Sequence, residues 1–280
     1  MGSPNLAIRK MTETDLAVAL DWAAAEGWNP GLNDAARFHL ADPEGFFIGE
    51  ANGEPIGAIS AVRYDERFGF LGLYLVRPEF RGRGFGLKLW QAAMRHLAER
   101  NVGLDGVVAQ QENYKKSGFK LAFRNIRYRG EGGGADAGGA TDLASLPFDE
   151  VLRYDSAMFP APRANFLRAW IGQPQATALG VVDQGKLRGY GVLRPCRSGC
   201  KIGPLFADDA RIAERLFLAL RARAAGQPIV LDVPEVNPAA VALAERYRMG
   251  PVFETARMYT KNSPQAPMER CFGVTTFELG

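Results

Sequence analysis

The chain has 280 residues, of which 47% are hydrophobic and 23% are charged. This composition is that of a folded globular protein and excludes a disordered chain, a collagen-like fibre and a disulfide scaffold. The 34 Lys and Arg residues and the 31 Asp and Glu residues leave a net charge of only +3, which argues against nucleic acid as the main partner. At about 100–200 residues per domain, the length predicts one large or two medium domains.

The sequence also lacks the usual marks of a membrane or secreted protein. No run of about 18 apolar residues predicts a membrane span, and residues 1–5 show no secretory pattern. Cys196, Cys200 and Cys271 are few and odd in number, which is typical of reduced thiols. The two histidines are remote from the cysteines in sequence, so no zinc site is predicted. We expect a cytoplasmic protein without a metal, a membrane partner or a nucleic-acid partner.

The first predicted elements are a hairpin, a strand, a long helix and a further strand, at 46–51, 56–63, 68–76, 84–100 and 104–109. Alternating and branched residues indicate the strands, and a repeating apolar face indicates the helix. The hairpin is antiparallel, whereas a strand–helix–strand crossover implies a parallel pair. Residues 1–129 are therefore predicted to form a mixed α/β domain.

A glycine-rich stretch at 130–140 predicts a flexible linker, because it can bury almost nothing. The same order of elements then returns, at 177–182, 187–193, 200–206, 208–225 and 228–233. The hairpin turns of both halves also carry two glycines four residues apart, Gly53 with Gly57 and Gly185 with Gly189. We therefore expect residues 141–280 to be a second mixed α/β domain and a distant copy of the first.

A glycine-rich loop, Arg81-Gly82-Arg83-Gly84-Phe85-Gly86, lies between the strand at 68–76 and the following helix. The first turn of a helix has unpaired N–H groups and a partial positive charge, and glycines let a ligand approach the backbone closely. This arrangement predicts a phosphate site. Leu87 stands where a nucleoside-triphosphate loop needs Lys and where a dinucleotide fingerprint needs its third glycine, so both of those sites are excluded.

The pattern Arg-x-x-Gly-x-Gly at 81–86, after a strand and Val76-Arg-Pro78, resembles the coenzyme A pyrophosphate loop of the GNAT acyltransferases. The resemblance implies acetyl-CoA as co-substrate and a bulge at 74–76 whose backbone N–H groups polarise the thioester. The cofactor-binding residues that it implies are Tyr74, Leu75, Val76, Arg81, Gly82, Arg83, Gly84, Phe85, Gly86, Leu87 and Tyr114.

A second match, Tyr114-Lys-Lys-Ser-Gly118-Phe119, resembles the Tyr-x-x-x-Gly-Phe stretch that follows the fifth strand in this family. The resemblance implies that Tyr114 protonates the departing thiolate. The alternative is a tyrosine that only packs at the end of a helix.

The second half lacks these motifs. Its strand at 201–206 runs into Asp208 and Asp209, so two carboxylates stand where the pyrophosphate would lie. The late motif Tyr247-Arg-Met-Gly250 also misplaces the tyrosine by one residue. We expect a tandem protein in which 1–129 is the active GNAT domain and 141–280 is a GNAT-like domain that has lost its cofactor site.

The resemblance implies that an acetyl group passes from acetyl-CoA to the amine of a small molecule, by direct attack in a ternary complex. The amine must lose a proton, but the strand at 68–76 carries no acid. Candidate bases are Glu26, Asp34, Asp65, Glu66, Glu112, Asp232 and Glu235, and a water relay is an alternative. Glu26 is the first choice because it shares a loop with Trp28 and Asn29, and the family commonly lines the acceptor site with that loop. Trp28 could instead simply pack on the core.

Two other functions stay open from the sequence. The missing base is compatible with a coenzyme A-binding sensor that does not turn over, and an open groove would favour a protein-lysine acetyltransferase. The sequence leaves monomer and homodimer equally open.

Overall fold

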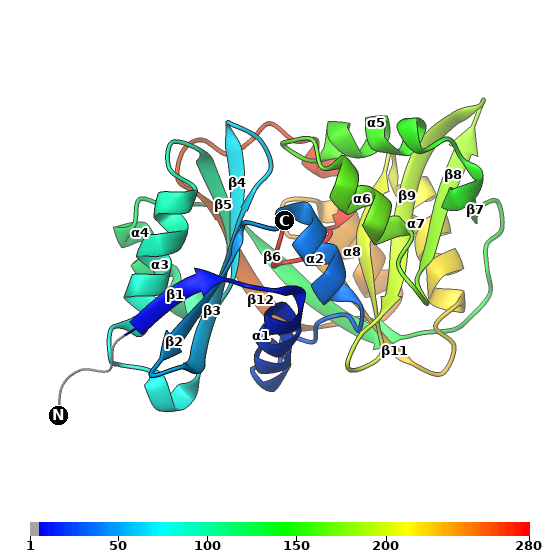
Figure 1. The fold of residues 1–280 in the computed structure, drawn as a ribbon. Coiled ribbons are helices and arrows are strands. Elements are labelled where there is room, and N and C mark those ends of the chain that lie inside the picture. The colour runs from blue at the N-terminus through cyan, green and yellow to red at the C-terminus, as the bar shows by residue number, and fades with distance from the viewer. Residues whose placement is uncertain (1–5) are drawn as a thin grey trace.

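The structure is a computed structural model and describes residues 6–280. The segment 1–5, which shows no secretory pattern, lies outside the described residues. The first half contains β1 (Leu6–Lys10), α1 (Glu13–Ala25), α2 (Asp34–Ala41), β2 (Phe46–Ala51), β3 (Glu54–Arg63), β4 (Phe68–Val76), α3 (Phe85–His96), β5 (Asn101–Val107), α4 (Gln111–Lys116) and β6 (Lys120–Glu131). The predicted mixed α/β fold is confirmed (Figure 1).

The second half repeats this order after a short strand and two helices. It contains β7 (Thr141–Asp142), α5 (Phe148–Met158), α6 (Ala164–Ile171), β8 (Thr177–Asp183), β9 (Lys186–Pro195), β10 (Cys200–Ala207), α7 (Ala210–Ala222), β11 (Pro228–Pro234), α8 (Pro238–Arg246), β12 (Gly250–Tyr259) and β13 (Cys271–Gly273). The hairpins are antiparallel, whereas β4 with β5 and β10 with β11 are parallel, as predicted. Among the residues that the structure describes, no helix has both the length and the apolar character of a membrane span.

A single sheet of 13 strands joins the two halves, in the order β1-β2-β3-β4-β5-β12-β6-β11-β10-β9-β8-β7, with β13 beside β10. The closing strand of each half pairs with the other half: β12 lies along β5, and β6 lies along β11. β6 and β12 also pair with each other in the middle of the sheet. The two predicted sheets are therefore joined edge to edge by exchanged strands.

The stretch predicted as a linker begins inside this exchange. Residues 130 and 131 belong to β6, where they pair with β11. The next two residues bind the second half through backbone hydrogen bonds, from Gly132 N to Gln227 O (2.8 Å) and from Gly133 N to Arg221 O (2.7 Å). The predicted boundary after residue 129 thus falls within a strand, and the connection proper runs over 134–140.

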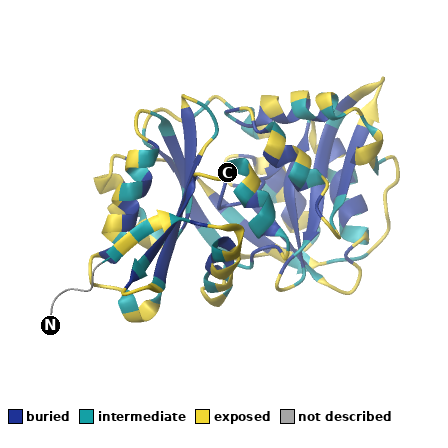
Figure 2. Ribbon diagram, viewed as in Figure 1, coloured by how far each residue is buried: buried dark blue, intermediate teal, exposed yellow. Residues whose placement is uncertain are grey.

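The helices form two layers around the sheet. α3 and α4 cover one face of the first half, and α7 and α8 cover one face of the second half, at opposite ends of the molecule (Figure 1). α1, α2, α5 and α6 lie between them and share one apolar core with strands of both halves. In this core Phe38 of α2 stacks on Trp170 of α6, with ring centroids 6.1 Å apart. Figure 2 shows that the central strands are buried along most of their length.

Candidate active site

The glycine-rich loop leaves its backbone open to solvent at the start of α3. Gly82 and Gly84 have φ of +75° and +79°, and no other atom lies within 4 Å of where their side chains would begin. Gly84 precedes α3 without a side-chain cap, and the first turn of α3 carries no acidic residue. The N–H groups of this turn are therefore available to an anion, and the loop fits a pyrophosphate.

Gly86 brings this helix close to β4. A Cβ at residue 86 would lie 2.7 Å from the hydroxyl of Tyr74, so only glycine fits there. The Tyr74 ring also contacts Trp90 of α3, with centroids 5.5 Å apart, and burial raises the pKa of Tyr74. The mouth of the loop and the end of β4 thus form one continuous site.

Two arginines and an apolar side chain flank the loop. Arg81 donates from Nε to Val76 O (2.8 Å), and its guanidinium pairs with Glu26. Arg83 lies over the Phe80 ring at 5.5 Å, and Leu87 is 60% exposed. Glu26, the first candidate base, is therefore the ion-pair partner of a loop arginine and does not line the pocket described below.

β4 and β5 separate at the level of the loop. Their parallel pairing ends at Leu71 and Leu104. Directly afterwards the register with β3 shifts, and Leu73 takes a φ of +45°, which makes a bulge at 73–74. The bulge starts one residue before the predicted 74–76. Because β4 no longer pairs with β5 beyond Leu71, its backbone groups on that side are open to a ligand.

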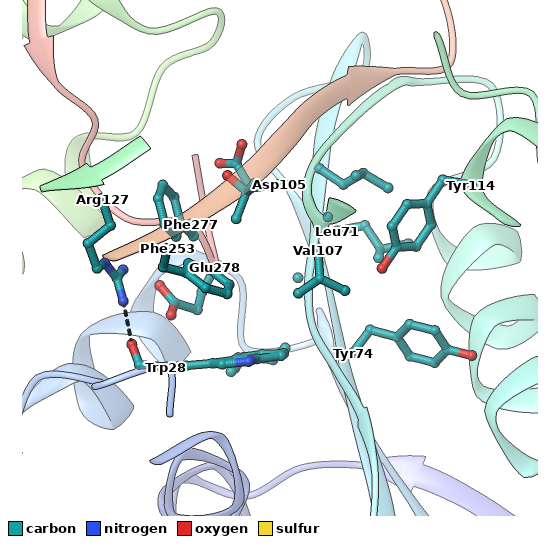
Figure 3. A pocket seen from close by; sticks show the side chains of 15 residues that line it. Trp28, Leu71, Tyr74, Asp105, Val107, Tyr114, Arg127, Phe253, Phe277 and Glu278 are labelled. Carbon is teal, nitrogen blue, oxygen red and sulfur yellow. Dashed lines mark hydrogen bonds between the residues drawn. The ribbon is translucent and has the colours of Figure 1, made fainter. Parts of the chain in front are cut away.

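A pocket occupies this opening and holds about 590 Å³ of space, part of it open to solvent. It is lined by Trp28, Leu71, Gly72, Leu73, Tyr74, Leu104, Asp105, Gly106, Val107, Tyr114, Arg127, Phe253, Thr255, Phe277 and Glu278. Figure 3 shows Tyr74 and Tyr114 on one side of the strands and Trp28, Arg127, Phe277 and Glu278 on the other. The pocket therefore passes between the strands, from the α3 side to the interface of the two halves.

Tyr114 is buried on the α3 side of the pocket. Its ring stacks on Trp90 with centroids 5.6 Å apart and lies directly over Gly106, where a Cβ would come within 2.2 Å of it. Burial raises the pKa of Tyr114 to about 12. The hydroxyl is therefore protonated at neutral pH and can donate a proton.

The predicted acceptor loop contributes one residue to the pocket. Trp28 lines it, and the Trp28 carbonyl accepts a hydrogen bond from Arg127 Nη1 (2.8 Å). Asn29 lies outside the lining and instead binds the backbone of Ser198 through two hydrogen bonds of 3.0 and 2.9 Å. Asn29 thus holds the loop against the second half.

None of the other candidate bases lines the pocket. Asp34 and Asp232 are buried, but they pair with Arg194 and Arg127. The remaining candidates lie in turns or at the surface: Asp65, Glu66, Glu112 and Glu235. The acids that do line the pocket are Asp105 and Glu278. The one available signal for Glu278 was a lone acid within the apolar run 271–280.

In the second half the corresponding opening is filled by the chain itself. β10 and β11 pair only from Cys200–Ile229 to Ile202–Leu231. β13 then pairs with β10, and Val274 N donates to Asp232 O (2.9 Å). Gly203 is packed so closely that a Cβ would lie 2.6 Å from Thr275 O. The segment 271–280 thus fills one opening before its last residues reach the other.

The two acids predicted to replace the pyrophosphate loop have structural partners. Asp209 caps α7 by accepting a hydrogen bond from Ile212 N (2.8 Å). Asp208 accepts hydrogen bonds from Tyr154 and Arg270. Across residues 6–280, no group of three or more His, Cys, Asp or Glu side chains is arranged to hold a metal.

Family models match both halves: an acetyltransferase (GNAT) family model over residues 14–119 and an acetyltransferase (GNAT) domain model over 151–273. Holothin acyltransferase of Pseudoalteromonas sp. is 33% identical over 263 residues, which cover 93% of this chain and 90% of that protein. A putative acetyltransferase from Pyrococcus horikoshii has a TM-score of 0.85 at 23% identity, covering 98% of this chain and 96% of the other. A tandem GNAT protein from the clavulanic acid biosynthesis pathway has a TM-score of 0.65 at 15% identity, over 92% of this chain and 100% of the other.

Proposed function

The chain is an acyltransferase that belongs to the GNAT family, and we propose that it transfers an acetyl group from acetyl-CoA to the amine of a small molecule. One observation carries this proposal: the bulge of β4, the open glycine loop and the buried Tyr114 all border the same opening between β4 and β5. The first half is the active half. The second half serves as a scaffold, because its own opening is filled by β13.

Binding of acetyl-CoA would rest on the loop 81–87 and on β4. Backbone N–H groups of the first turn of α3 would hold the pyrophosphate, with Arg81 and Arg83 beside them. A phosphate that binds Arg81 would compete with Glu26 for the guanidinium. The backbone of 74–76 would hold the thioester end in the pocket and face the oxygen on which negative charge develops. One such donor can be worth about 3 kcal/mol of transition-state stabilisation.

The bound thioester supplies an activated acyl carbon. In a ternary complex the amine nitrogen attacks that carbon directly, a C–N bond forms, the C–S bond breaks, and its electron pair leaves with sulfur. Tyr114 donates the proton that the sulfur takes up, because its raised pKa keeps it protonated until that moment.

The enclosure of the acceptor side supports a small substrate. Trp28, Phe253 and Phe277 surround the pocket where it reaches the interface of the halves. A lysine presented by a folded protein needs an open groove, which such a closed end does not offer. The three cysteines are buried and unpaired, which supports a reducing, cytoplasmic location. Monomer and homodimer both stay open.

The test is release of free thiol from acetyl-CoA in the presence of a panel of small amines and lysine peptides, with the product identified by mass spectrometry. We expect release with small amines and a mass gain of one acetyl group on the amine. Tight acetyl-CoA binding without release on any amine would instead support a sensor. Turnover on lysine peptides alone would support the protein-lysine activity.

A further inference from the structure

Glu278 is a buried acid placed at the narrowest part of the pocket. Its residue is 4% exposed and lines the pocket on the same side as Trp28 (Figure 3). Its backbone packs directly on β4: a Cβ at Gly72 would lie 2.1 Å from Glu278 O. Gly72 is the first residue after the pairing of β4 with β5 ends. Glu278 therefore lies beside the point where the strands open.

The other acid of the pocket is fully engaged. Asp105 accepts hydrogen bonds from Arg257 Nε (2.8 Å) and Nη2 (2.6 Å), and a third from Asn125 Nδ2 (2.8 Å). Glu278, by contrast, forms no ion pair with any residue that the structure describes. Of the two pocket acids, Glu278 is thus the one that can receive a proton from a ligand without first breaking an ion pair.

Thr276 fixes the orientation of the Glu278 carboxylate. Its hydroxyl accepts a hydrogen bond from Glu278 N (3.0 Å) and donates to Glu278 Oε2. Within residues 6–280, no donor is bound to the second oxygen, Oε1. A carboxylate held by one oxygen, with the other turned to a pocket, is the arrangement that a positioned base requires.

Charged groups from three neighbouring strands face this carboxylate. They are Arg127 on β6, Arg194 on β9 and Asp105 on β5. Burial lowers the pKa of Arg127 and of Arg194, but the carboxylates near each of them, Glu278 included, raise it more, so both stay charged. Glu278 thus lies in a site of mixed charge, where two arginines support its ionised form.

We infer that Glu278 is the base that binds the acceptor amine and takes its proton, an inference that rests on the proposed acyl transfer. As the C–N bond forms and the C–S bond breaks, one N–H proton passes from the amine to Glu278 Oε1. The leaving sulfur takes its own proton from Tyr114, on the opposite side of the strands. Glu278 then returns its proton to solvent and Tyr114 regains one. The segment 271–280 thereby supplies a catalytic group to the first half.

The test is Glu278→Gln, which keeps the shape of the side chain and removes its basicity. We expect kcat to fall by about 10²- to 10⁴-fold, with the Kd for acetyl-CoA changed by less than about twofold. The decline of kcat/KM for the acceptor at low pH, which reports protonation of Glu278 in the wild type, should disappear. Glu269→Gln is the matched control, since it removes an exposed carboxylate from the same region, and it should leave both kcat and the pH profile unchanged.

The outcomes separate the two proposals. Wild-type turnover that survives in Glu278→Gln would overturn the inference and leave the proposed function intact. No acyl transfer by the wild type on any amine would overturn both. A loss of acetyl-CoA binding in proportion to kcat, with the low-pH decline retained, would show a packing role and also overturn the inference. If Glu278→Gln does not fold, Glu278→Asp tests the same point: it should lose part of kcat and keep the pH decline.

Discussion

Arg127 and Asp232 lie opposite each other on β6 and β11 and are joined by hydrogen bonds of 2.6 and 2.8 Å. Both side chains are almost completely buried. The remaining amino group of Arg127 donates to the carbonyl of Trp28 (2.8 Å). One guanidinium therefore ties the exchanged strand β6 to the second half and, at the same time, fixes the loop that lines the acceptor side of the pocket.

Asp232→Asn should destabilise the protein by about 3–5 kcal/mol, because it leaves a buried guanidinium without its counter-charge. It should also raise the KM for the acceptor, since Arg127 orients Trp28. Urea unfolding and steady-state kinetics measure the two effects. Glu254→Gln is the control: it breaks a half-exposed pair with Arg124 at 3.3 Å and should cost less than about 1 kcal/mol. Equal losses in the two variants would contradict the role assigned to the buried pair.

Gly84→Asp should reduce acetyl-CoA affinity at least tenfold by calorimetry, because a carboxylate would face the pyrophosphate at the start of α3. Gly185→Asp is a matched control, since Gly185 also has a positive φ, +72°, and open space around it, but lies in the β8–β9 turn. Both substitutions impose a similar backbone strain of about 1 kcal/mol. Only the first should affect binding; an unchanged affinity in Gly84→Asp would remove the pyrophosphate site from this loop.

Tyr114→Phe should lower kcat by about 10²-fold while acetyl-CoA still binds, because the ring and its stacking on Trp90 are kept. The pKa of about 12 means that the hydroxyl stays protonated up to high pH. Any decline of kcat below pH 10 should therefore persist in the variant. Tyr247→Phe, which alters a tyrosine bonded to Glu214 in the second half, should leave kcat unchanged. Full activity of Tyr114→Phe would exclude it as the proton donor.

Lys201→Met should stabilise the protein by about 1–3 kcal/mol near neutral pH, because Lys201 is buried and its Nζ finds no partner among the described residues. Burial lowers the pKa of Lys201 below 10.5. Between that lowered value and the ordinary one, the unfolded chain binds more protons than the folded one, so wild-type stability rises with pH. The advantage of the Met variant should shrink over this window.

Urea unfolding of Lys201→Met between pH 7 and 10 measures this change, with the exposed Lys186→Met as control. A stability difference that stays constant over the whole range would show that Lys201 is charged in the folded protein throughout. In that case burial would not have lowered its pKa into the range tested.

The sequence predicts the elements around the loop well because their signals are local. Pro78 ends β4, the glycines mark the turn, and an apolar face marks α3, so this part of the site could be described before the structure. Trp28 and Tyr114, expected at the two ends of the site, do line one pocket. For Tyr114 and Trp28 the roles themselves remain predictions.

The exchange of β6 and β12 could not be predicted, because alternation along a strand shows which face is buried but not which strand lies next to it. The same is true of 271–280. Its apolar residues indicate burial, yet only the pairing of β13 with β10 brings Glu278 to Gly72, about 200 positions away in the chain. Assigning the base to Glu26 was reasonable from loop position, but the ion pair with Arg81 occupies that carboxylate.

The reciprocal strands make the two copies inseparable. A first half produced alone would lack β12 and present a bare, hydrophobic edge at β5, and the second half would do the same at β11. A copy without chemistry of its own is therefore still indispensable, since deleting it would remove both a wall of the catalytic unit and the strand that completes its sheet. Selection can retain such a partner for architecture alone.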